Sequence, residues 1–301
     1  MPWRATSRTH VAVDAAQLAR LARWADVVLL QRPNQPEFVL RAVQRMRCSV
    51  VIDIDDALWV SSQGTWSGSY GDRVVRAVRS ASAVTVGSDH LHRWVRDVEP
   101  SVRCEVIRPA TPLESAVRPA MNDRDVVLGW IGTPGNFRDL ELIAPALQAL
   151  VGQPVAGGAG RIRLRVVSSE PYSPNGVDSE FVPWHEATQA DALAGFDIGL
   201  MPLHDDERSR GRCGFKAIQY FSAGRPVVAS PVGAAEEIVD DGVSGRLAGS
   251  VERWVDAITE LAERPDLRAR FGQEGRRWVK EHASEEVSFG RLLDLLEAIA
   301  P

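Results

Sequence analysis

Lysine is almost absent from this chain of 301 residues: two of its 35 basic residues are lysines, Lys216 and Lys280, and the others are arginines. A lysine carries a compact ammonium group, whereas an arginine carries a broad planar fork. In a sequence that uses arginine for nearly every cation, a lysine in the first turn of a predicted helix is a candidate anion-binding group. Lys216 has this position, two residues after Gly214, and an ordinary solvated lysine is the alternative.

Cysteines and long apolar runs are also scarce. Cys48, Cys104 and Cys213 lack the spacing of metal ligands, and isolated free thiols suit a reducing compartment. No apolar run reaches about 18 residues, so we expect no membrane-spanning helix. The first residues lack the apolar core of a signal peptide, which favours a cytoplasmic protein.

The chain also has no excess of positive charge. Its net charge of -5 gives no bulk electrostatic reason to bind nucleic acid or an anionic membrane. We therefore expect no nucleic-acid partner and at most peripheral membrane contact, through local arginine clusters. The hydrophobic share of 45% and the charged share of 25% are typical of a globular protein, and the length suits two domains. The oligomeric state stays open.

Short apolar runs alternate with helical patterns along the whole chain, and no longer repeat is visible. Runs such as 26–32 and 48–59 are separated by helical patterns of about 10 to 15 residues, which is typical of a parallel, doubly wound sheet. Pro109, Pro112 and Pro119 interrupt the rhythm and predict an interdomain linker between residues 109 and 125. The sequence therefore predicts an α/β protein with two domains.

The segment 211–247 is the most informative stretch. It reads as a glycine-flanked loop, a helix, a Gly-Arg-Pro turn, a buried strand, a second turn and a short acidic helix. Ligands of open α/β sheets bind beyond the carboxyl ends of strands, where helix N-termini offer N–H groups to phosphate. The start of the helix at Gly214 and Phe215, with Lys216 in its first turn, is therefore the predicted anion site.

From Ala223 to Gly245 this segment resembles the donor-binding motif of the group 1 family of retaining glycosyltransferases, which have the GT-B fold. The matching features are the Gly-Pro turn, the Val-Val-Ala-Ser strand, the next Gly turn and the ending Asp-Gly-x-x-Gly. The family motif also has two glutamates, the first at the transferred sugar and the second at the donor ribose. Here Gly211 and Gln219 stand at those positions. The resemblance thus places Gln219 at the ribose, whereas Gly211 offers no side chain to the sugar.

The resemblance implies two Rossmann-like, doubly wound parallel-sheet domains that face each other across a cleft. It implies an abbreviated acceptor-side domain at 1–112, a donor domain at 113–285 and a C-terminal helix at 286–301 that returns toward the first domain. The implied activity is transfer of a hexose-like sugar, with retention of configuration, from a nucleotide diphosphate to a hydroxyl group of a small molecule or glycan. The nucleotide sugar is a substrate, and neither a cofactor nor a metal is expected.

A turn of small residues follows the first strand of the second domain and offers a second part of the phosphate site. Backbone N–H groups approach phosphate closely in such turns, although most turns of this composition are only turns. Many family members place basic residues here, whereas this chain has Thr133 and, approximately, Arg138, so Arg212 and Lys216 are expected to neutralise the departing diphosphate. The full set expected at the diphosphate is Gly132, Thr133, Asn136, Arg138, Gly214 and Phe215.

Three carboxylates, Asp53, Asp55 and Asp56, come at the carboxyl end of a predicted strand. Crowded carboxylates require water, a cation or a polar ligand, although one of them could simply cap the next helix. The family often has a catalytic histidine at this strand end, which this chain lacks. We expect Asp55 or Asp56 to bind or polarise the acceptor hydroxyl. The same stretch also resembles the Asp-x-Asp strand of haloacid-dehalogenase-type phosphohydrolases, which would use Asp53 and Asp55.

Trp184 stands at a strand end where the family contacts the nucleotide base, and it is the candidate for that role, with a structural tryptophan as the alternative. The missing glutamates also leave open a catalytically inactive homologue that binds nucleotide sugars, and a nucleotide-sugar epimerase of related architecture is a further possibility. Donor binding without transfer or hydrolysis would identify the inactive homologue.

Overall fold

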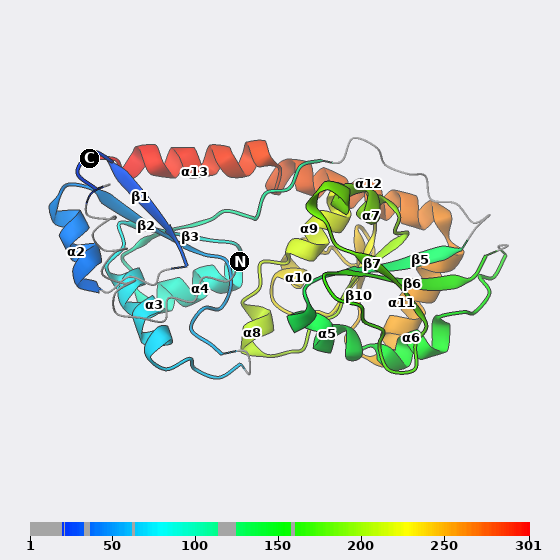
Figure 1. The fold of residues 1–301 in the computed structure, drawn as a ribbon. Coiled ribbons are helices and arrows are strands. Elements are labelled where there is room, and N and C mark those ends of the chain that lie inside the picture. Colours follow the sequence, from blue (N-terminus) through cyan, green and yellow to red (C-terminus); the bar gives the residue numbers. More distant parts are fainter. Residues whose placement is uncertain (1–19, 21, 33–36, 62–63, 114–124, 158–159) are drawn as a thin grey trace. The chain divides into compact units, whose positions relative to one another are not determined.

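The structure is a computed structural model that describes residues 20, 22–32, 37–61, 64–113, 125–157 and 160–301 (Figure 1). The chain divides into two compact units, which are described separately. Unit 1 comprises Met1–Arg108, Asp206–Cys213 and Ser288–Pro301, and unit 2 comprises Pro109–Asp205 and Gly214–Val287. Most of the expected linker, 114–124, lies outside the described residues, as does the start of the chain up to residue 19.

Unit 1 is built on a parallel sheet in the order β1-β2-β3-β4. Its strands are β1 (Val27–Gln31), β2 (Ser49–Ile54), β3 (Ala83–Val86) and β4 (Arg103–Val106). They are connected by α2 (Glu37–Arg45), α3 (Ser69–Arg79) and α4 (Asp89–Val98). Right-handed crossovers between sequential neighbours place all three helices on one face.

The two faces of the β2 strand explain how the core of unit 1 is divided. Val50, Ile52 and Ile54 pack in one cluster with the buried faces of α2, α3 and α4. Val51 points the other way and packs with Leu295 of α13 (Glu285–Ile299). Successive side chains of a strand point to opposite faces, so this alternation places α13 across the sheet from α2.

Unit 2 is built on a six-stranded parallel sheet in the order β10-β9-β8-β5-β6-β7. Its strands are β5 (Val126–Ile131), β6 (Ile162–Ser168), β7 (Ser179–Pro183), β8 (Ile198–Met201), β9 (Val227–Ala229) and β10 (Gly245–Leu247). Its helices are α5 (Phe137–Glu141), α6 (Ala144–Leu150), α7 (Gln189–Ala194), α9 (Phe215–Ser222), α10 (Ala234–Ile238), α11 (Val251–Glu263) and α12 (Pro265–His282).

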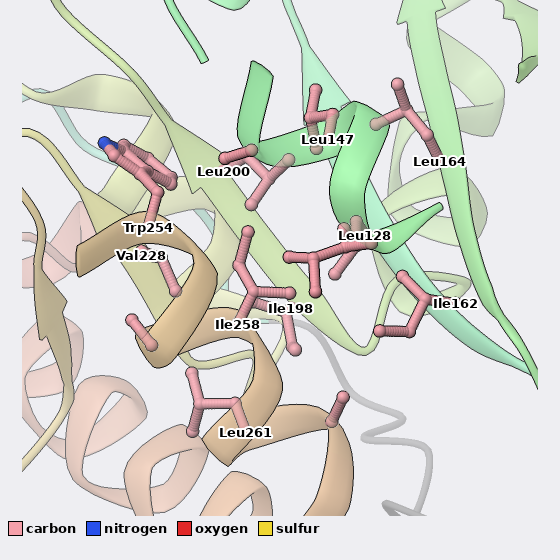
Figure 2. Packing of buried hydrophobic residues seen from close by; sticks show 14 of the residues in the cluster. Leu128, Leu147, Ile162, Leu164, Ile198, Leu200, Val228, Trp254, Ile258 and Leu261 are labelled. Carbon is pink, nitrogen blue, oxygen red and sulfur yellow. The ribbon is translucent and has the colours of Figure 1, made fainter. Parts of the chain in front are cut away.

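Both faces of the unit 2 sheet are covered. Every residue of β5 is buried, as expected for a parallel strand between two helix layers. Figure 2 shows one layer, in which Leu128 of β5 and Ile198 of β8 pack with Leu147 of α6 and with Ile258 and Leu261 of α11. The opposite face packs against α7, α9 and α10. The two parallel-sheet α/β domains predicted from the sequence are confirmed. The connecting helices cover both faces in unit 2, whereas in unit 1 they cover one face and α13 packs on the other.

One expected helix is divided in two. The pattern at 139–151 predicts a continuous helix, but the structure has α5 and α6 with a break at Leu142 and Ile143. Pro145 lies in the first turn of α6. Because proline lacks an N–H group and its ring clashes with the carbonyl four residues earlier, the first helix cannot continue through it. Among the described residues, no helix combines the length and apolar character needed to cross a membrane.

Candidate functional site

The strand order of unit 2 creates a point where two neighbouring strands separate. β5 pairs with β8 only through Leu128 with Ile198 and Gly129 with Gly199. A Cβ atom at Gly129 would lie 1.9 Å from the ring of Phe196, and one at Gly199 would lie 2.3 Å from the ring of Tyr220. Two aromatic rings thus press on the glycine pair, and beyond it the strands diverge at the carboxyl end of the sheet.

Tyr220 of α9 fills the gap between the diverging strands. Its hydroxyl donates to the carbonyl of Leu200 at 3.1 Å and accepts from the N–H of Ile131 at 3.2 Å. Burial raises the pKa of Tyr220, so the hydroxyl stays protonated and continues to donate. α9 is therefore fixed to the switch point of the sheet, which is where open α/β sheets bind their ligands.

Lys216, on the same helix, reaches the glycine turn that follows β5. A Cβ atom at Gly132 would lie 3.2 Å from Cε of Lys216, so the two are in close contact. The Lys216 ammonium lies 5.4 Å from the ring centroid of Trp130, which is fully buried. The structure thus brings Lys216 and Gly132 together, with the ammonium at the carboxyl end of β5.

Gly214 allows α9 to begin at this place. It has the left-handed conformation, with φ of 68°, and a Cβ atom there would lie 2.5 Å from Cδ1 of Ile238. Both the conformation and the space favour glycine. The first N–H groups of the helix, at Phe215 and Lys216, lie at the positive end of the helix dipole. A helix start and an ammonium group therefore act in the same small region.

The other residues predicted at the diphosphate lie on the same turn but differ in how they are arranged. Asn136 donates to the hydroxyl of Thr133 at 3.3 Å, and Thr133 is exposed. Arg138 is exposed, and its guanidinium lies 3.6 Å from the buried carboxylate of Asp139. Phe215 is 42% exposed at the start of α9. Their roles toward a ligand stay predictions.

The predicted ribose and base residues occupy different environments. Gln219 is 6% exposed, one turn along α9 from Phe215. Trp184 follows the edge strand β7, is 42% exposed, and donates through Nε1 to Oε1 of Gln189 at 2.9 Å. β6 separates β7 from β5. Adjacent strands lie about 4.8 Å apart, so Trp184 follows a strand about 10 Å from the one that leads to Gly132.

The carboxyl end of the unit 1 sheet carries an ion-paired acidic cluster. Arg32, at the end of β1, binds Asp55 through Nε at 3.1 Å and through Nη2 at 2.9 Å, and its Nη2 also lies 3.3 Å from Asp56. The hydrogen bond that Arg32 donates to Asp55 raises the pKa of Arg32. Arg32 has φ of 55°, an uncommon conformation for a residue other than glycine. The fork of Arg32 thus holds two of the three predicted carboxylates.

The carboxyl groups of Asp53 and Asp56 are less acidic than usual. Burial raises the pKa of both, and the neighbouring charge of Asp55 acts in the same direction. Oδ1 of Asp53 accepts from the hydroxyl of Thr85 on β3 at 2.7 Å. Asp53 is therefore tied into the sheet, while Asp55 and Asp56 extend beyond it.

Asp55 and Asp56 lie in the loop that follows β2, which we call the acidic loop. The segment Asp206–Cys213, which includes α8 (Glu207–Arg210), packs on the acidic loop within unit 1. A Cβ atom at Gly211 would lie 2.3 Å from Cβ of Ala57, and the thiol of Cys213 donates to the carbonyl of Asp55 at 2.7 Å. No side chain fits at Gly211, which explains why the family's first glutamate is missing. Arg212 also belongs to unit 1, where its positive charge offsets part of the rise that burial causes in the pKa of Asp56. Its expected role at the diphosphate stays a prediction.

Three residues of these regions were not identified from the sequence as functional. The sequence places Tyr220 on the same helix face as Lys216 but assigns it no role, and it does not distinguish Trp130. The contacts of both residues depend on strand order. Arg32 follows the last residue of β1, and β1 pairs with β2 in a register that places Gln31 opposite Asp53. The position of Arg32 at the end of a strand was therefore the available signal. Among the residues that the structure describes, no group of three His, Cys, Asp or Glu side chains is arranged to hold a metal ion.

Sequence comparison connects the Lys216 region with a known family. Residues 125–264 match the family described as "Glycosyl transferases group 1". A curated relative is D-inositol 3-phosphate glycosyltransferase of Saccharomonospora viridis, 28% identical over 219 residues. That alignment covers 67% of this chain and 48% of the relative, so the chain spans about half the length of the protein it matches.

Solved structures match nearly the whole chain. S. aureus TarM, crystallised with UDP, α-GlcNAc-glycerol and fondaparinux, matches with a TM-score of 0.73 and 14% identity over 95% of this chain and 58% of its own. Anabaena HepE, in complex with UDP and glucose, matches with a TM-score of 0.71 and 17% identity over 97% of this chain and 83% of its own. The comparisons confirm both the resemblance to group 1 glycosyltransferases and the GT-B fold.

Proposed function

We propose that this chain, which has the GT-B fold and matches group 1 glycosyltransferases over residues 125–264, transfers a sugar from a nucleotide diphosphate to a hydroxyl acceptor. The observation that carries the proposal is the contact between Lys216 and Gly132 at the switch point of the unit 2 sheet, beside the N-terminus of α9. Support also comes from the two similar structures that contain UDP.

The chemistry required of this region is stabilisation of a departing diphosphate. The bond between the anomeric carbon and a β-phosphate oxygen breaks, and negative charge develops on that phosphate. A fixed ammonium at Lys216 and the first N–H groups of α9, at Phe215 and Lys216, stabilise that charge without reorganisation. The N–H of Gly132 itself donates to the carbonyl of Val167 at 3.0 Å, which fixes the turn beside them. Tyr220 fixes α9 to both β5 and β8, so these hydrogen-bonding groups are held in place before the nucleotide sugar binds.

On the acceptor side we assign the hydroxyl group to the acidic loop of unit 1. The acceptor oxygen forms the new bond to the anomeric carbon and loses its proton. Asp56 suits proton acceptance because burial raises its pKa above that of an ordinary carboxylate. Arg32 holds Asp55 and contacts Asp56, which fixes the loop. The roles of Gln219 at the ribose and Trp184 at the base, retention of configuration and independence from metal belong to this proposal.

The proposal is tested by offering the purified chain a panel of nucleoside diphosphates and nucleotide sugars. A ligand that binds only the folded protein raises the unfolding temperature by mass action. The donor found in this way is then incubated with hydroxyl acceptors, and the anomeric configuration of the product is determined by NMR, with and without a chelator. Transfer with retention supports the full proposal. Binding without transfer or hydrolysis identifies the inactive homologue, and absence of any nucleotide binding overturns the proposal.

A further inference from the structure

One stretch of positive charge in this acidic protein lies apart from the Lys216 segment. Residues 20–47 contain six arginines and two acidic residues, a net charge of +4, whereas the whole chain carries -5. The segment includes β1, the edge strand of the unit 1 sheet, and α2, the first helix on its covered face. The proposed transfer reaction uses only Arg32 of this segment. Of the other arginines, Arg41 forms an ion pair with Glu37 one turn earlier on α2.

The solvent face of α2 combines this charge with an exposed aromatic ring. Phe38 is 72% exposed, and the side chain of Arg41 is 65% exposed. Phe38, Arg41 and Arg45 follow one another at spacings of three and four residues and so share one helix face. The opposite face, with Val39, Leu40 and Val43, is buried in the unit 1 core. The exposed ring is therefore not a consequence of a loosely packed helix.

A second exposed aromatic ring lies at the end of the sheet where α2 finishes. Trp24 is 76% exposed and precedes β1, while Met46 is 37% exposed and precedes β2. The two turns are adjacent because the N–H of Ser49 donates to the carbonyl of Asp26 at 2.9 Å. We call Trp24, Phe38, Arg41, Arg45, Met46 and Arg47 together the basic aromatic surface. Its elements are the first part of the blue region in Figure 1.

We infer that the basic aromatic surface docks unit 1 on the surface of an anionic lipid bilayer. Amphipathic rings and sulfur-containing chains enter the boundary between head groups and acyl chains, while guanidinium groups meet lipid phosphate. The charge is complementary to an anionic leaflet, and it is flanked by Trp24 and Phe38, the two most exposed aromatic residues in the part of the chain that the structure describes. A polyanion such as nucleic acid would satisfy the charge, but it would meet the acidic remainder of the chain along its length. This inference goes beyond the proposed transfer reaction and does not depend on it.

The test is co-sedimentation of the full chain with phosphatidylcholine vesicles that contain or lack phosphatidylglycerol. We expect binding to the anionic vesicles only, weakening as salt is added. Each arginine near an anionic surface contributes about fivefold to partitioning, so the double substitution Arg41→Gln and Arg45→Gln should lower it by about 25-fold. Phe38→Ser should lower it severalfold at unchanged charge, and Trp24→Ser should do the same.

Matched controls distinguish this surface from charge or exposure in general. Arg264→Gln with Arg277→Gln removes two exposed arginines from the unit 2 helices, and Phe289→Ser removes an aromatic ring that is 65% exposed on α13. These variants should sediment like the unaltered chain. Absence of vesicle binding, equal loss in the controls, or no loss in the α2 variants overturns the inference. Tighter binding to a single-stranded oligonucleotide, abolished by the α2 substitutions, overturns it in favour of nucleic acid. Unfolding temperatures confirm that each variant is folded.

Discussion

The carboxyl ends of the two sheets use different means to prepare for a ligand. In unit 2 the region is formed by Gly132, Gly214 and one ammonium group on a buried tryptophan, so most of its donors belong to the backbone. In unit 1 the region is formed by charged side chains, with Arg32 bound to Asp55 and Asp56. A backbone site loses function when a side chain is added, whereas a side-chain site loses function when one is removed.

The comparison also shows how the carboxyl end of the unit 2 sheet can offer positive charge with few cationic side chains. Backbone N–H groups and a helix terminus supply partial positive charge at fixed positions. A single lysine then adds a full charge where it is needed. The carboxyl end of β2 has three carboxylates, Asp53, Asp55 and Asp56. Burial raises the pKa of Asp53 and Asp56, and the positive charge of Arg32 limits the repulsion within the group. The two regions therefore differ in how strongly they should respond to the loss of one charge.

Removal of the Lys216 ammonium should have the largest effect. We expect Lys216→Ala to reduce kcat/KM for the donor by about 10³-fold, because the charge on the departing diphosphate would lose its only side-chain cation on α9. Lys280→Ala, the change at the other lysine, should leave turnover unaltered. The measurement is steady-state kinetics of both variants and of the unaltered chain, with the nucleotide sugar identified by thermal shift. Turnover close to that of the unaltered chain would remove Lys216 from the mechanism.

Addition of the family's glutamate at Gly211 should harm the protein rather than restore it. A Cβ atom there would lie 2.3 Å from Cβ and 2.9 Å from the backbone nitrogen of Ala57. We expect Gly211→Glu to destabilise the fold by about 1–3 kcal/mol, since overpacking moves the backbone of the acidic loop. Denaturant unfolding measures the cost. Ala57→Gly in the same chain should recover part of it, and a gain in turnover would contradict the steric explanation.

Much of this arrangement was predictable from the sequence. The alternation of apolar runs with helical patterns predicts both parallel sheets, because strands buried on both faces are apolar throughout, as in β5. The glycines and Lys216 predict a phosphate site because only a few residue types suit a turn after a strand and a helix start. The resemblance and the GT-B fold are confirmed, whereas the ligand roles of the individual site residues stay predictions.

What the sequence could not predict depends on contacts between distant segments. The bridge from Tyr220 to Ile131 and Leu200 exists because β5 and β8 are neighbours that separate, which no local pattern reveals. Arg32 meets Asp55 across the β1–β2 register, 23 residues away. The packing of Gly211 on Ala57 likewise joins segments that are far apart, and it accounts for the departure from the family motif. The break at Pro145, in contrast, follows from local chemistry and was missed.

The role of Tyr220 provides a test of how rigid the backbone site is. Tyr220→Phe removes a fully buried hydroxyl, so the N–H of Ile131 and the carbonyl of Leu200 each lose the hydrogen bond that they make to it. We expect a loss of about 1–3 kcal/mol in the free energy of unfolding, with weaker donor binding. Tyr172→Phe is the control, because its hydroxyl binds the partly exposed Glu141, which water can solvate instead. Equal costs for the two substitutions would argue against a special role for Tyr220.

The smallest expected effects on stability concern Asp56 and Glu260, two carboxylates whose pKa values shift in opposite directions. Burial raises the pKa of Asp56 in the folded chain, so its stabilising contribution is present below the unfolded pKa and is lost as pH rises through the folded value. The hydrogen bond from Arg246 lowers the pKa of Glu260, so its contribution is present above the unfolded pKa and is lost as pH falls through the folded value. Asp56→Asn should therefore stabilise the chain at neutral pH, and Glu260→Gln should destabilise it.

Both shifts in stability should be modest because neither side chain is fully buried. The side chain of Asp56 is 48% exposed and that of Glu260 is 33% exposed. Solvent screening limits each effect to a few tenths of a kcal/mol. Unfolding temperatures measured between about pH 3 and pH 7 should show the two variants diverging from the unaltered chain in opposite directions as pH rises. A shift of both variants in the same direction would mean that Arg32 compensates Asp56 as fully as Arg246 compensates Glu260, and the contrast between the two regions would not extend to their charges.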